Sequence, residues 1–211
     1  MRKNLIERAA LVAMLLLVFL AAGWIGGLGL APDVRLIRQF QLIRGDAPQL
    51  TLAAIAVTQA GSAFATLGGG LMVAAWLAWR GHRWRATVLG AAVLAERMVV
   101  DGLKLFVDRA RPSFDLHPVV THSSSFPSGH AGNSMAVFLS IALIAVPRAH
   151  RTVAVIIALL ASLLVGSTRP YLGVHWPSDV IGGWALGAAI AILAWSIAER
   201  RGSEAAAEQE H

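Results

Sequence analysis

Long uncharged stretches alternate along the chain with short segments that carry most of the charges. Two of the uncharged runs cover residues 9–31 and 47–79. A helix that crosses a bilayer needs about 20 mostly apolar residues, so runs of this kind predict transmembrane helices. The pattern predicts an all-α, polytopic membrane protein with one six-helix bundle. The expected spans are residues 8–30, 52–79, 86–107, 129–147, 152–168 and 179–198.

The remaining segments predict an interfacial helix and a tail. In residues 33–45, Leu36, Phe40 and Ile43 follow an i, i+4, i+7 pattern, which is typical of a short helix lying in the membrane interface. An ordinary connecting loop fits this segment equally well. Residues 201–211 are polar and predict a flexible tail, so residues 1–200 are expected to form a single domain.

The first apolar run begins after a basic N-terminus and could also be a signal peptide. It continues past any cleavage point to spanning length, which favours an uncleaved first span.

Composition supports membrane insertion and excludes other classes. The 211 residues are 56% hydrophobic and only 14% charged, with a mean hydropathy of +0.63, whereas about 25% of residues are charged in soluble domains. The net charge of +6 could indicate nucleic-acid binding, but the basic residues lie at the ends of apolar runs and form no contiguous patch. There are no cysteines, which excludes disulfides and thiol chemistry without identifying the compartment.

The distribution of basic residues predicts the orientation of the chain. With the N-terminus in the cytoplasm, ten of the 18 Lys and Arg residues fall on the cytoplasmic side, as the positive-inside rule requires. Both termini are then cytoplasmic. The cytoplasmic set is Arg2, Lys3, Arg8, Arg80, Arg83, Arg85, Arg148, Arg151, Arg200 and Arg201.

The third expected span is unusual because it is charged. Arg97, Asp101, Lys104, Asp108 and Arg111 recur at steps of 4, 3, 4 and 3 residues, which would place them on one helical face. Charges inside a membrane are costly and generally have a function. For Arg97 and Asp101, a functional role and a structural ladder of ion pairs are both open. The outer end carries an excess of cations.

A polar stretch, SSSFPSGHAGNSMA, opens the fourth expected span. Pro127 and Ser128 suit a helix start, and Gly129 allows a ligand to approach the backbone. The free N–H groups of a helix N-terminus bind anions, and His130 would lie in the first turn. A capped helix with an incidental histidine is the alternative. The serines at 123–125 are expected to be ordinary loop residues.

A third polar cluster lies between the fifth and sixth spans, at residues 167–179. It contains Arg169, His175 and Asp179, and Pro177 suits the first turn of the sixth span. Asp179 would then be within reach of the His175 imidazole, and a carboxylate bonded to one ring nitrogen leaves the other free to attack. A polar loop with a capping aspartate is the alternative.

All three clusters fall on the outer side of the membrane, because each lies where an odd-numbered span ends and an even-numbered span begins. Three cations, Lys104, Arg111 and Arg169, together with backbone donors suit a phosphate. Two histidines can serve as nucleophile and as acid, although the residues alone do not decide which one attacks.

Two other functions use the same residues. A metal site could draw on His117, His122, His130, His175 and Asp179, but three neighbouring cations would repel a divalent ion, so no metal or other cofactor is expected. A transporter or flippase for anionic lipids would need the basic cluster without either histidine.

The three clusters resemble the signature motifs of the type 2 phosphatidic acid phosphatase superfamily. The first motif is matched by KLFVDRARP, residues 104–112, and the second by PSGH, residues 127–130. The third is matched by TRPYLGVHWPSD, residues 168–179, where Thr168 replaces the usual serine and keeps the hydroxyl. The motif core therefore covers residues 104–179 of a transmembrane phosphatase domain.

The resemblance implies a role for each matching residue. His175 would attack phosphorus and form a phosphohistidine, Asp179 would orient it, and His130 would protonate the leaving oxygen and then activate water. The phosphate would be held by Lys104, Arg111, Ser128, Gly129 and Arg169.

The resemblance also implies a lipid phosphate as substrate, in the cytoplasmic (inner) membrane of a bacterium. Undecaprenyl diphosphate is the first choice because its head group is handled on the outer face. Phosphatidylglycerol phosphate, phosphatidic acid and lipid A phosphates are the alternatives. The expected partners are this lipid and the surrounding membrane lipids, without nucleic acid, and the sequence does not indicate an oligomeric state.

Overall fold

The structure is a computed structural model that describes residues 2–27, 31–114, 118–119 and 123–208. Within these residues all regular secondary structure is helical. The elements are α1 (Arg2–Gly27), α2 (Ala31–Asp46), α3 (Pro48–Thr58), the short 3₁₀ helix η1 (Gln59–Gly61), α4 (Ala63–Trp79), α5 (Arg83–Phe106), α6 (Gly129–Ser140), the π-helix η2 (Ile141–Ala145), α7 (Arg148–Tyr171) and α8 (Pro177–Glu208).

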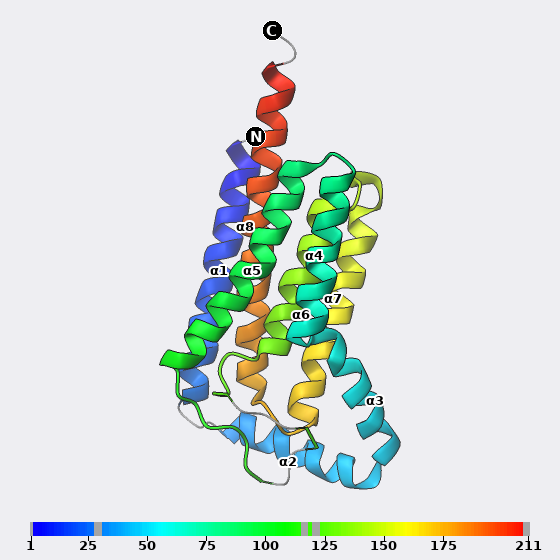
Figure 1. Cartoon of the computed structure of the whole chain (residues 1–211). Coiled ribbons are helices and arrows are strands. Elements are labelled where there is room, and N and C mark those ends of the chain that lie inside the picture. Colours follow the sequence, from blue (N-terminus) through cyan, green and yellow to red (C-terminus); the bar gives the residue numbers. More distant parts are fainter. Residues whose placement is uncertain (1, 28–30, 115–117, 120–122, 209–211) are drawn as a thin grey trace.

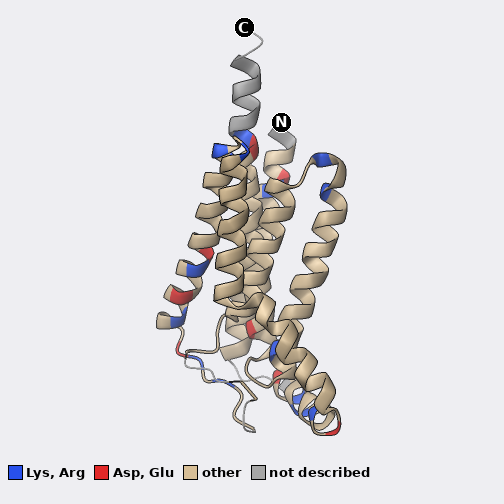
Figure 2. Ribbon diagram, turned by 45° about the vertical axis from the view of Figure 1, so that its right-hand side comes forward, with Lys and Arg blue, Asp and Glu red and all other residues tan. Residues whose placement is uncertain are grey.

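The long helices run alongside one another, and α8 packs against α1, α5, α6 and α7 (Figure 1). α2 and α3 cover one end of this bundle, whereas α1 begins and α8 ends at the opposite end (Figure 1). Charged residues gather mainly at the two ends, and the middle of the bundle is largely uncharged (Figure 2). This distribution is the one that a bilayer would impose on a helical bundle.

Glycines let α6 and α8 approach closely at the end that carries the sequence motifs. A Cβ at Gly183 would lie 2.6 Å from the carbonyl oxygen of Ser128, and one at Gly187 would lie 2.5 Å from that of Gly132. Such distances are far below van der Waals contact, so the backbones meet only because these positions lack side chains. The close contact brings the starts of α6 and α8 together.

Among the described residues, three helices are long and apolar enough to span a bilayer: Asn4–Gly27 in α1, Arg148–Tyr171 in α7 and Pro177–Arg200 in α8. The broken helix formed by Pro48–Gly61 and Ala63–Trp79, bent by 44°, is a possible fourth span. The expected third span, in α5, contains several charges, and the apolar helix Gly129–Ala145 is shorter. Six spans therefore remain a prediction.

Two elements extend beyond the bounds expected from the sequence. α2 is helical over Ala31–Asp46, which includes the whole segment expected to be an interfacial helix. α8 continues to Glu208 and so includes most of the segment expected to be a flexible tail, of which residues 209–211 lie outside the described part of the chain.

The expected row of charges on the third span is only partly present. α5 ends at Phe106, so Asp108 and Arg111 follow the helix instead of extending its face, and that part of the prediction is wrong. Arg97 and Asp101 do form an ion pair, with 2.7 Å between Nε and Oδ2. Their side chains are 36% and 49% exposed, so this pair lies on the flank of the bundle and not in its interior.

Candidate active site

The residues of the three sequence motifs come together where α5 and α7 end and where α6 and α8 begin. A backbone hydrogen bond of 3.0 Å from the Ser128 amide to the Asp179 carbonyl joins the first turns of α6 and α8. This end of the bundle is the one covered by α2 (Figure 1).

His175 and Asp179 form a buried pair at the start of α8. His175 Nδ1 lies 3.5 Å from Asp179 Oδ2, and the two residues are 2% and 0% exposed. On the other side of the ring, Arg111 Nη1 lies 3.1 Å from His175 Nε2. A guanidinium can only donate, so Nε2 accepts and the ring proton belongs on Nδ1, toward Asp179. This tautomer leaves the Nε2 lone pair on the side of the cations.

Asp179 accepts hydrogen bonds from several donors. The Ser125 hydroxyl donates to its Oδ2, and so does the Trp176 amide over 2.8 Å. Its Oδ1 accepts a short hydrogen bond from Arg109. These donors fix the orientation of the carboxylate, which is fully buried.

The three cations expected to bind phosphate reach this region from different elements. Lys104 Nζ donates to Ser123 Oγ over 3.1 Å and lies 3.8 Å from where a Cβ of Gly129 would be. Arg111 donates through Nε to the carbonyl oxygen of Ser123 (2.8 Å). Lys104 and Arg111 are thus linked by one serine.

Arg169, near the end of α7, is 4% exposed and donates through Nη1 to Thr58 Oγ1 over 2.8 Å. Its Nε has no hydrogen-bond partner among the described residues, and neither does the hydroxyl of Ser128. Buried donors of this kind are costly unless a ligand accepts from them. An anion near the start of α6 would satisfy both.

His130 lies in the first turn of α6. Gly61 packs closely against it, because a Cβ at Gly61 would lie 2.9 Å from the His130 carbonyl oxygen. The positive charges of Arg169, Lys104 and Arg111 act on the His130 ring. His130 therefore belongs to the same group of residues.

Burial and positive charge set the proton affinity of two groups in the loops. Desolvation lowers the pKa of His175 well below its usual 6.5, and the cations Arg111, Arg169 and Lys104 lower it further. Desolvation also lowers the pKa of Arg111, which Asp179 partly offsets. His175 is consequently a neutral imidazole at pH 7, as a nucleophile must be.

The alternative metal site finds no geometric support in the described part of the chain, where no three His, Asp or Glu residues are grouped as ligands. His117 and His122, two of the candidates, lie outside the described residues.

Several residues of the site were not predicted from the sequence. Ser123 and Ser125 were expected to be ordinary loop residues, but they contact Lys104, Arg111 and Asp179. Thr58, which accepts from Arg169, and Asp33, which accepts from Arg109, come from distant segments, and no local signal marks them. Arg109 lies inside the first motif, between Lys104 and Arg111. This position in the sequence could have indicated that Arg109 belongs to the site.

Comparison with known families decides the classification. The family model of the PAP2 superfamily matches residues 85–203, more than half of the chain. The chain belongs to the PAP2 superfamily. This assignment confirms the resemblance drawn from the three motifs.

Curated relatives share about a third of the aligned residues with the chain. Phosphatidylglycerophosphatase B of Bacillus subtilis is 38% identical over 110 residues, covering 49% of this chain and 53% of that protein. Lipid A 1-phosphatase of Rhizobium johnstonii is 35% identical over 120 residues (52% and 46%). Undecaprenyl-diphosphatase of Sulfolobus acidocaldarius is 36% identical over 86 residues (41% and 39%). The chain spans about half the length of the curated relatives that it matches.

Solved structures show the same fold over most of the chain. The crystal structure of a transmembrane PAP2 type phosphatidylglycerolphosphate phosphatase from Bacillus subtilis has a TM-score of 0.81 and 28% identity, over 90% of this chain and 96% of that one. The Aquifex aeolicus LpxE structure has a TM-score of 0.63 and 26% identity, over 79% and 96%. With its apolar helices, the chain is an integral membrane protein with the PAP2 membrane phosphatase fold.

Proposed function

We propose that this PAP2 protein is a metal-independent phosphatase that removes phosphate from a membrane lipid through a phosphohistidine. The observation that carries the proposal is the arrangement around His175. Its Nδ1 faces a buried carboxylate, its Nε2 faces Arg111, and the positive charges of Lys104 and Arg169 also act on the ring. A neutral nucleophile directed into a cluster of three cations suits attack on a phosphoryl group.

In the first step, Nε2 of His175 attacks phosphorus, and the bond between phosphorus and the lipid oxygen breaks. His130, in its protonated form, donates a proton to the departing oxygen, so the lipid leaves as an alcohol or as a monophosphate. Asp179 stabilises the positive charge that develops on the ring. Arg111 must exchange Nε2 for a phosphate oxygen, and this exchange frees the lone pair.

In the second step, water attacks the phosphohistidine and the bond between nitrogen and phosphorus breaks. His130, now neutral, accepts a proton from this water, and inorganic phosphate leaves. Throughout, Lys104, Arg111 and Arg169 neutralise the phosphoryl oxygens, assisted by Ser128 and the Gly129 amide.

Undecaprenyl diphosphate is the proposed substrate, with phosphatidylglycerol phosphate, phosphatidic acid and lipid A phosphate as alternatives. The relatives are named for three of these four lipids, which supports the class and leaves the choice to the proposed orientation. With the N-terminus in the cytoplasm, the site faces outward, where the diphosphate head group is handled.

An assay of the detergent-solubilised protein in EDTA tests the reaction. Phosphate release from undecaprenyl diphosphate is expected from the wild type, and His175→Ala is expected to lose nearly all of it. Equal release from both proteins would contradict the assigned nucleophile. Loss of activity in EDTA that a divalent ion restores would revive the metal site, and binding without hydrolysis would favour a transporter.

A panel of the four lipids, with kcat/KM measured for each, tests the substrate. The highest value is expected for undecaprenyl diphosphate. A higher value for phosphatidylglycerol phosphate would transfer the assignment to that lipid.

A further inference from the structure

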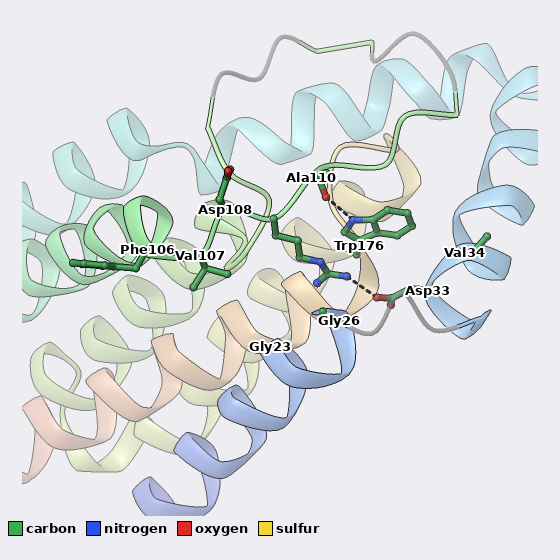
Figure 3. A pocket seen from close by; sticks show the side chains of 11 residues that line it. Gly23, Gly26, Asp33, Val34, Phe106, Val107, Asp108, Ala110 and Trp176 are labelled. Carbon is green, nitrogen blue, oxygen red and sulfur yellow. Dashed lines mark hydrogen bonds and ion pairs between the residues drawn. The ribbon is translucent and has the colours of Figure 1, made fainter.

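Arg109 lies in the first sequence motif, between Lys104 and Arg111. Its side chain contacts the start of α8 and the first turn of α2. Its Nη1 donates to Asp179 Oδ1 and, over 2.9 Å, to Ser178 Oγ. Its Nη2 donates to Asp33 Oδ2 over 3.1 Å (Figure 3). Only 12% of the side chain is exposed.

The backbone of Arg109 is fixed as well. Its amide donates to the Ser124 hydroxyl over 3.2 Å, and its carbonyl accepts from the Ser125 amide over 2.9 Å. Ser125 in turn donates to Asp179. Arg109 thus holds the Asp179 carboxylate directly through its guanidinium and indirectly through Ser125.

The far side of the guanidinium is in contact with α1 and α2. A Cβ at Gly26 would lie 2.1 Å from Arg109 Nη1, so only glycine leaves room for the guanidinium there. Asp33, 8% exposed, accepts from Arg109 and also from the Ser178 amide over 3.1 Å. The C-terminal end of α1, at Gly26, and the first turn of α2, at Asp33, therefore determine where the Arg109 guanidinium lies.

We propose that Arg109 is a positioning residue for the His175–Asp179 pair, kept in place by Gly26 and Asp33. It holds the Asp179 oxygen that does not face His175, and it acts on the reaction through Asp179 without touching the phosphate. This inference rests on the proposed function.

Charge pairing separates Arg109 from the phosphate-binding cations. The guanidinium of Arg109 lies between two buried carboxylates, Asp33 and Asp179, so its single positive charge is already paired. Arg169 instead has a neutral partner, Thr58, and a buried Nε with no partner among the described residues. An anion is attracted to the second arrangement and not to the first.

The planar, forked shape of the guanidinium also matters. Two nitrogens of Arg109 reach acceptors on α2 and α8 at once, whereas a lysine ammonium is a compact point charge without this fixed geometry. Arg109→Lys is therefore expected to keep the charge and still lose much of the positioning.

A cavity of about 600 Å³ adjoins Arg109, lined among others by Gly23, Phe106 and Trp176 (Figure 3). It gives a small solute access to the place that the guanidinium occupies. Free guanidinium could therefore replace the side chain in Arg109→Ala, which offers a test that a general loss of stability would not pass.

The experiment compares kcat, KM and the inhibition constant for inorganic phosphate in four proteins: wild type, Arg109→Met, Gly26→Ala and Gly27→Ala. A misplaced catalytic group costs about 100-fold in rate, so kcat of Arg109→Met is expected to fall by about that factor. KM and the phosphate inhibition constant should stay within about twofold. Gly26→Ala keeps every charge and is expected to lower kcat too, because its methyl group displaces the guanidinium.

Gly27→Ala is the matched control, because a Cβ at this position meets nothing within 4 Å. Its kcat should equal that of the wild type. Millimolar guanidinium should raise kcat of Arg109→Ala, whereas sodium chloride of equal ionic strength should not.

Unchanged kcat in Arg109→Met would overturn the proposal. A rise in KM and in the phosphate inhibition constant at constant kcat would overturn it as well, because Arg109 would then be a phosphate ligand. If Arg109→Met fails to fold, Gly26→Ala decides, and wild-type kcat in that variant overturns the proposal. A wild type that releases no phosphate would instead contradict the proposed function.

Discussion

The imidazole of His175 has a carboxylate on one side and a guanidinium on the other, and its tautomer follows from these two neighbours. The spacing of His175 and Asp179 across a helix start predicted the first contact. The contact between Arg111 and His175 could not be predicted, because Arg111 lies in a loop 64 residues earlier in the chain. For the same reason Asp33 and Thr58 could not be predicted as site residues, because their partners belong to distant segments.

The low pKa of His175 predicts a pH dependence. Burial and three cations favour the neutral ring, so the histidine should take up its proton only below pH 6.5. The unfolded chain binds that proton near pH 6.5, so this group lowers the stability of the native protein as the pH falls below 6.5 and has no effect above it.

Nitrogen NMR of histidine-labelled protein measures this titration, and the His175→Gln spectrum assigns the signal. A neutral ring at pH 6.5 is the expected result. A titration midpoint at or above 6.5 would contradict the burial argument.

At the scale of elements, the starts of α6 and α8 form the framework of the site. The sequence predicted both helix starts correctly, because Pro127 and Pro177 mark them. It placed the end of the third span at residue 107, next to the end of α5 at Phe106, but it wrongly extended the charged helical face to Asp108 and Arg111. The loop that follows α5 turns Arg109 and Arg111 toward α8, and only tertiary contacts show this.

Close packing of α6 and α8 predicts a large effect of Gly187→Ala. The added methyl group would lie 2.5 Å from the Gly132 carbonyl oxygen and 3.0 Å from the Ala136 amide nitrogen, so a backbone must shift. Overpacking of this kind costs about 1–3 kcal/mol. The thermal unfolding midpoint in detergent is therefore expected to fall.

Gly69→Ala serves as the control, because a Cβ there meets nothing within 4 Å. In a helix this substitution should be neutral or slightly stabilising. Equal midpoints for the two variants would show that α6 and α8 are not held by this contact.

At the scale of the whole molecule, both ends of the helical bundle are polar, but they differ in function. One end carries the candidate active site and is covered by α2. At the other end, Glu199 of α8 accepts from Arg8 of α1 (2.7 Å) and Arg151 of α7 (3.0 Å) and so links the three helices. The all-helical membrane fold was predictable from hydropathy alone. Six crossings and the outward orientation stay predictions, because α5 and α6 depend on neighbouring helices for burial.

Cysteine labelling tests the orientation, and the chain has no native cysteines to interfere. Gln39→Cys lies on α2 near the site, and Ala149→Cys lies at the opposite end of the bundle, and both positions are exposed. In intact cells, a membrane-impermeant maleimide should label the first variant only. Labelling of only the second would reverse the proposed topology.

The central claim is that His175 carries the phosphoryl group, and rapid quenching tests it most directly. Wild type and His175→Ala are mixed with undecaprenyl diphosphate labelled on its terminal phosphate, quenched in base and separated from lipid. The account predicts an acid-labile, base-stable label on the wild-type protein and none on His175→Ala. A label of equal amount on both proteins, or turnover by His175→Ala at the wild-type rate, would contradict it.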